Sequence, residues 1–66
     1  MRYIIYTAER GHRHICRGGA DTYEQLLEVT GKIIERFKHL SITANVMYHD
    51  LITGEWVTMY DHECGF

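Results

Sequence analysis

Only one segment of this 66-residue chain has the apolar spacing of a helix, and segments with the spacing of strands flank it on both sides. Apolar side chains in that segment recur every three or four residues, which places them on one face of an amphipathic helix. They are Tyr23, Leu26, Leu27, Ile33, Ile34, Phe37 and Leu40. Such a helix has to bury its apolar face against another layer, and the flanking strands provide that layer.

Local signals indicate where the elements begin and end. Asp21 followed three residues later by Glu24 matches a capping box, so we expect the helix to cover about residues 22–39. The two glycines at 18 and 19 are expected to lead the chain out of the sheet. Alternating or β-branched segments predict strands at about residues 2–8, 12–17, 41–49 and 55–60. The sequence therefore predicts one α+β domain over residues 1–66, with a small antiparallel β-sheet of ββαββ order packed on one helix.

The turn around Gly54 decides which residues of the last strand face the helix. In a three-residue loop with Gly54 in the left-handed conformation, Trp56 and Tyr60 share a face with Val46. In a two-residue turn they lie beside His49 on the opposite face. We favour the first arrangement, because it places the large aromatic residues under the helix.

The formal net charge of −2 conceals an asymmetry along the chain. Residues 1–17 contain four arginines and one carboxylate, whereas residues 41–66 contain four carboxylates and neither lysine nor arginine. A nucleic-acid-binding protein needs a broad positive field to displace counterions from the phosphates. The charge distribution therefore disfavours nucleic acid and favours a protein as the partner.

One helix can cover only one side of a four-stranded sheet, so the other side is open to solvent or to a partner. In the favoured register, methionines and polar residues occupy this side, and methionine suits adaptable binding surfaces. Charged residues of the two hairpins surround it. The expected binding residues are Arg10, Arg13, Arg17, Asn45, Met47, His49, Glu55, Val57 and Met59.

Histidines and cysteines offer an alternative hypothesis, a zinc site. His12, His14 and Cys16 alternate along one strand, and His62 and Cys64 lie near the C-terminus. Imidazole and thiolate are suitable zinc ligands, but this spacing differs from the patterns of common structural sites. We therefore expect no metal and no cofactor, and two free thiols.

No segment brings together a nucleophile, a base and an orienting group, so we do not expect an enzyme. The apolar runs are much shorter than a membrane span, and the N-terminal residues do not resemble a secretory signal. These observations predict a cytoplasmic protein, in the cell that produces it or in its host, without a membrane partner.

We therefore expect a small non-enzymatic protein-binding module, acting as a stoichiometric inhibitor or regulator of a larger complex. Inhibitors of host defence complexes from phages or mobile elements are one class of this size. Such a chain could also form a homodimer through an edge strand. The alternatives are a zinc-binding mini-domain and a nucleic-acid-binding accessory protein that uses the basic first hairpin.

Overall fold

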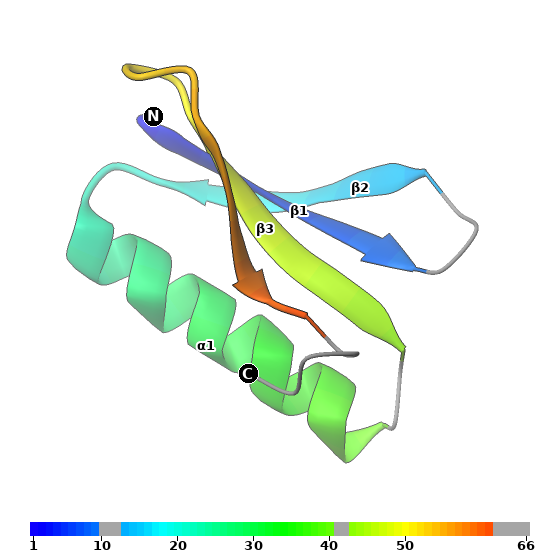
Figure 1. Ribbon diagram of the computed structural model, residues 1–66. Helices are drawn as coiled ribbons and strands as arrows, with labels where there is room; N and C mark the ends of the chain where they lie inside the picture. Colours follow the sequence, from blue (N-terminus) through cyan, green and yellow to red (C-terminus); the bar gives the residue numbers. More distant parts are fainter. Residues whose placement is uncertain (10–12, 41–42, 62–66) are drawn as a thin grey trace.

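The computed structural model describes residues 1–9, 13–40 and 43–61. These residues form β1 (Tyr3–Glu9), β2 (His14–Ala20), α1 (Tyr23–His39), β3 (Ala44–Asp50) and β4 (Trp56–Tyr60). The strands make one antiparallel sheet in the order β2-β1-β3-β4, and α1 packs on one side of it (Figure 1). The predicted fold class is confirmed. No helix in these ranges is long and apolar enough to cross a membrane.

The strand boundaries differ from the prediction most clearly in β2. We expected a strand at 12–17, but β2 continues through Gly18 and Gly19, which pair with Ile5 and Ile4 of β1. Arg17 is an extra residue at this point, because Tyr6 pairs with Cys16 while Ile5 already pairs with Gly18. This β-bulge shifts the register by one residue, and both glycines pair with β1 beyond it. Strand β3 ends at 50 rather than 49, and the expected strand residues 12, 41 and 42 lie outside the described ranges.

The helix begins one residue later than the capping box predicted. Thr22, not Asp21, is the N-cap, with an extended backbone and a side-chain oxygen that accepts a hydrogen bond from the Gln25 backbone N–H at 3.2 Å. The Gln25 side-chain oxygen in turn accepts from the Asp21 backbone N–H at 3.0 Å. The arrangement differs from a capping box in its second bond, because the Gln25 side chain accepts from the N–H of Asp21, the residue before the N-cap, rather than from the N–H of Thr22.

The core lies between α1 and the two central strands. Alternate residues of β1 and β3 point toward the helix, and Ile5 and Val46 are fully buried against Leu26. A buried hydroxyl on the helix, that of Thr30, donates to the Leu26 carbonyl oxygen at 2.7 Å. The apolar helical stripe and the alternation of the strands therefore meet in one layer, as the two periodicities require.

The β3–β4 hairpin has a four-residue loop, residues 51–54, rather than the predicted three-residue loop. The Asp50 N–H donates to the Glu55 carbonyl oxygen at 2.9 Å, and His49 therefore pairs with Trp56. Gly54 has a φ of 78°, so the expected left-handed glycine is present. The additional loop residue turns Trp56 to the side of the sheet away from the helix, since shifting a register by one residue reverses every side chain.

A β-bulge in β4 then turns the Tyr60 side chain back to the helix side of the sheet. Met47 pairs with Thr58 while Val46 pairs with Tyr60, so Met59 is the extra residue. Tyr60 is buried on the helix side beside Val46, whereas Trp56 lies on the opposite side. Both alternatives considered from the sequence placed these two aromatic residues on one face, and both were wrong.

Candidate functional site

The side of the sheet away from α1, called here the open face, receives side chains from all four strands. Its residues follow from the pairing of neighbouring strands. They are Ile4, Tyr6, Ala8, His14, Cys16, Asn45, Met47, His49, Trp56 and Thr58. Within the strands that the structure describes, this set has aromatic, apolar and hydrogen-bonding side chains and no carboxylate.

Four rings, one from each strand, gather at one end of the open face, and we call them the aromatic cluster. Trp56 lies at its centre and stacks on His49, with ring centroids 4.4 Å apart and planes within 5° of parallel. The ring of Tyr6 lies 5.1 Å from that of Trp56, and the ring of His14 lies 6.2 Å from it. These separations are typical of favourable aromatic pairs.

Trp56 is 54% exposed despite these three neighbours. Tryptophan is usually well buried in a folded protein, so a half-exposed tryptophan at the centre of a ring cluster is informative. The cluster holds the indole in one place, because His49 supports it from below and the backbone pairing of β3 and β4 fixes the spacing. The result is a surface that offers stacking, apolar contact and hydrogen-bond donors.

Three of the expected binding residues lie on the open face, namely Asn45, Met47 and His49. Val57 and Met59 do not, because Val57 pairs with Tyr48 on the helix side, and both are partly buried against the core. Their assignment to the open face followed from the three-residue loop and was wrong.

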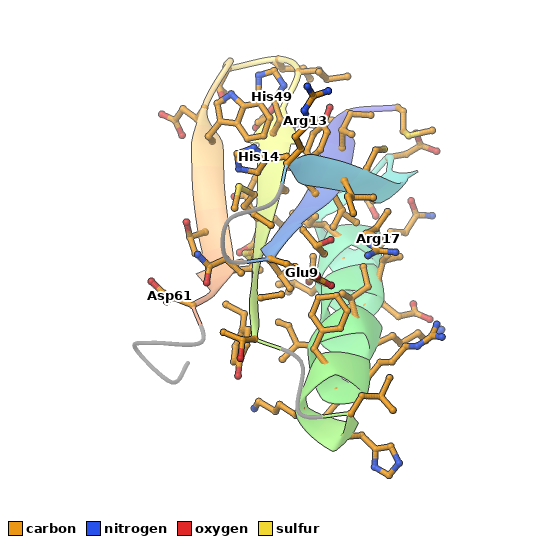
Figure 2. The ribbon with its side chains drawn as sticks, turned by 90° about the vertical axis from the view of Figure 1, so that its right-hand side faces the viewer. Glu9, Arg13, His14, Arg17, His49 and Asp61 are labelled. Carbon is orange, nitrogen blue, oxygen red and sulfur yellow. The ribbon has the colours of Figure 1, made fainter. Side chains whose placement is uncertain are left out.

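The expected charged residues are distributed over different parts of the molecule. Arg13 is exposed and lies at the same end of the molecule as His14 and His49 (Figure 2). Glu55 lies opposite Asp50, which faces the helix side. Burial raises the pKa of Tyr48, and the nearby Tyr23, Tyr3, Asp50 and Glu55 add smaller contributions in the same direction.

We expected Arg17 to extend freely from a basic hairpin, but its side chain is held by a hydrogen bond. Its Nε donates to the hydroxyl oxygen of Thr7 at 2.9 Å, and Thr7 is fully buried beneath α1. Arg17 is thus directed toward the helix side of the sheet, away from Arg13 and the aromatic cluster. Arg10 lies outside the described residues.

The candidate metal ligands are only partly described. His14 and the free Cys16 both lie on the open face, opposite Ala8 and Tyr6 respectively. His12, His62 and Cys64 lie outside the described residues. Within residues 1–9, 13–40 and 43–61, no group of three or more histidine, cysteine or acidic side chains could hold a metal ion.

No sequence pattern indicated a side-chain interaction that lies near the loop at residues 51–54. The carboxylate of Asp50 accepts hydrogen bonds from the Arg2 guanidinium at 3.2 and 3.4 Å and from the Ile52 backbone N–H at 2.9 Å. The bond from Arg2 holds the pKa of Asp50 below its usual value. This interaction connects the residue before β1 to the end of β3 and stabilises the loop that positions Trp56.

No protein-family model matches this chain, and no curated protein or solved structure shows a significant similarity to it.

Proposed function

We propose that this chain is a protein-binding module that docks a partner on its open face, with Trp56 as the central anchor. The observation that carries the proposal is the exposed Trp56 ring, held by Tyr6, His14 and His49 in the aromatic cluster. Residues that dominate the binding energy of protein interfaces are enriched in tryptophan, tyrosine and arginine. Arg13, at the same end of the molecule, adds a charged residue at the rim.

The edges of the sheet favour docking on the face over docking along an edge. Both edge strands contain a β-bulge, at Arg17 in β2 and at Met59 in β4. A bulge interrupts the regular row of backbone groups that another strand would need for pairing, and natural sheets use bulges to prevent such pairing. A partner is therefore expected to approach the open face, and a homodimer formed through an edge strand is disfavoured.

A module of this kind acts by occupying the surface of its partner. The role we propose is that of a stoichiometric inhibitor or regulator of a larger protein complex. Trp56 contributes its stacked ring and its indole N–H at the centre, while Asn45, Met47 and Thr58 supply adaptable contacts around it.

The test compares the wild-type chain with Trp56→Ala and with a matched control, Tyr23→Ala. Tyr23 lies on the helix and is 51% exposed, close to the 54% of Trp56. Each variant is immobilised, partners are captured from an extract of the producing or host cell, and the affinity for the purified partner is measured by calorimetry. We expect one partner per chain and a weakening of roughly 30-fold or more for Trp56→Ala only. Equal binding by both variants would contradict the proposal.

One observation favours nucleic acid as a second candidate partner. Aromatic rings on an open sheet can stack with unpaired bases, and the aromatic cluster has this arrangement at the same end of the molecule as Arg13. The chain has one tryptophan, so its fluorescence reports directly on the cluster. Quenching by a thymidine 12-mer that weakens steeply with salt would support this candidate and argue against a protein partner.

A further inference from the structure

A shallow cavity of about 200 Å³ lies on the helix side of the sheet, separate from the open face. It forms where the second half of α1 meets the end of β1 and the bulged part of β2. Its walls are Glu9, Arg17, Ile33, Arg36, Phe37 and Leu40. In Figure 2, Glu9 and Arg17 lie next to the helix, away from Arg13 and His49.

The helix supplies an apolar wall. Ile33, Phe37 and Leu40 follow each other at intervals of four and three residues, so they lie along one side of α1. Phe37 is buried at the base of this wall, whereas Leu40 is about half exposed at the mouth. A small apolar group in the cavity would replace water against these three side chains.

Two guanidinium groups border the apolar wall. Arg17 comes from β2 and is held by its Nε bond to Thr7, which leaves the four N–H donors of its terminal nitrogens for other acceptors. Arg36 comes from the last turn of the helix and has an exposed side chain. Two arginines on different elements, one of them oriented by a buried hydroxyl, suit the planar geometry of a carboxylate.

Glu9 limits the charge that the cavity can accept. Two guanidinium groups and one carboxylate give these walls a charge of +1. A single negative charge on a ligand is therefore neutralised, whereas a dianion such as phosphate would bring an excess charge close to Glu9. The volume is below the range of about 300–1,000 Å³ that is typical of drug-sized ligand sites, so the ligand has to be small.

We propose that this cavity binds small monocarboxylates with a short apolar tail. The carboxylate contacts Arg17 and Arg36, and the tail lies against Ile33 and Phe37. A site this small and open binds weakly, and we expect a dissociation constant on the order of 1 mM. This inference is independent of the protein partner proposed for the open face.

The experiment titrates the ¹⁵N-labelled chain with three probes of one shape: 3-phenylpropionate, 3-phenylpropanol and 3-phenylpropylamine. Amide shifts of residues 33–40 in NMR spectra report on the cavity. We expect saturable shifts with the carboxylate, at least five-fold weaker binding of the alcohol, and no binding of the amine. Inorganic phosphate, tested in the same way, is expected to bind more weakly than the carboxylate.

Three single substitutions test the roles of the charges. Arg36→Gln should weaken binding of 3-phenylpropionate at least five-fold, and Glu9→Gln should strengthen it several-fold by removing the repulsion. Lys32→Gln makes the same change in net charge as Arg36→Gln at an exposed residue outside the cavity, and should leave the affinity unchanged. The amide spectrum of each variant verifies its fold. Equal affinity for acid and alcohol, tighter binding of phosphate, or an absence of any shift would each overturn the proposal.

Discussion

Asp50 illustrates how much one side chain contributes to the geometry of the candidate site. Its carboxylate accepts hydrogen bonds from Arg2 and from the backbone N–H groups of Ile52 and Thr53. The first contact connects the two central strands, and the other two fix the start of the loop. Since that loop determines the pairing of His49 with Trp56, Asp50 supports the aromatic cluster without belonging to it.

We predict that Asp50→Asn lowers the melting temperature at pH 7 and makes the melting temperature less sensitive to a fall in pH. The Arg2 hydrogen bond lowers the pKa of Asp50 in the folded state, so the ionised carboxylate stabilises the fold above the unfolded pKa, which is about 3.8. This stabilisation is lost as the pH falls through the lower folded value. Circular dichroism melts between pH 2 and pH 7 should therefore show the difference between wild type and variant narrowing below pH 4.

Glu28→Gln is the control for this experiment. Glu28 forms an ion pair with Lys32 at 3.3 Å on the exposed surface of the helix, where such pairs contribute little. Its melting temperature should stay close to that of the wild type throughout. If Asp50→Asn behaves in the same way as Glu28→Gln, the Arg2–Asp50 contact does not stabilise the fold.

At the scale of single elements, the helix and the last hairpin show how small offsets in sequence change local structure. The helix N-cap is displaced by one residue, from Asp21 to Thr22, without altering which face of α1 is buried. The loop at residues 51–54 is longer by one residue than expected, and this turns the Trp56 side chain to the opposite face of the sheet. A one-residue shift of a helix boundary leaves the buried face of the helix unchanged. A one-residue shift of strand register moves every side chain of the strand to the opposite face of the sheet.

We predict that Thr22→Ala lowers the free energy of unfolding by about 1 kcal/mol, because the Gln25 backbone N–H loses its acceptor. Asp21→Ala is the comparison. It removes only an exposed ion pair with the N-terminal amine and should have a smaller effect. Urea unfolding followed by circular dichroism measures both. A larger loss for Asp21→Ala would identify Asp21 as the functional cap.

The core of the whole molecule is thin, so a single buried side chain contributes a large part of its stability. Consecutive leucines on α1 provide a matched pair: Leu26 is 0% exposed and Leu27 is 46% exposed. Truncation of a buried leucine to alanine typically costs about 2–5 kcal/mol, whereas a domain of this size rarely has more than about 3–5 kcal/mol in total.

Leu26→Ala is therefore expected to leave a large fraction of molecules unfolded at 25 °C, while Leu27→Ala should remain folded. Near-ultraviolet circular dichroism and dispersion of amide shifts distinguish the two outcomes. Similar stability of the two variants would show that the helix is not packed on the sheet in the way described.

The sequence predicted the architecture well and the candidate site poorly, and the reason is physical. The apolar stripe of α1 and the alternation of β3 extend over many residues, so errors at their ends do not change the element type. The aromatic cluster instead depends on the length of one loop and on the bulge at Met59. The loop is stabilised by hydrogen bonds from Ile52, Thr53 and Arg2 to Asp50, and the bond from Arg2 joins residues far apart in sequence. The shift at Met59 has no comparable signal in the sequence.

Pairing between β1 and β3 also determines when the chain can acquire its structure during synthesis. Tyr3 pairs with Asp50 and Glu9 pairs with Ala44, so β1 cannot complete this pairing until the ribosome has synthesised β3. At about 5–20 residues per second, the 41 residues from 9 to 50 require roughly 2–8 s. During that interval one edge of β1 exposes unpaired backbone amides and carbonyls. The nascent chain is then most vulnerable to aggregation and proteolysis.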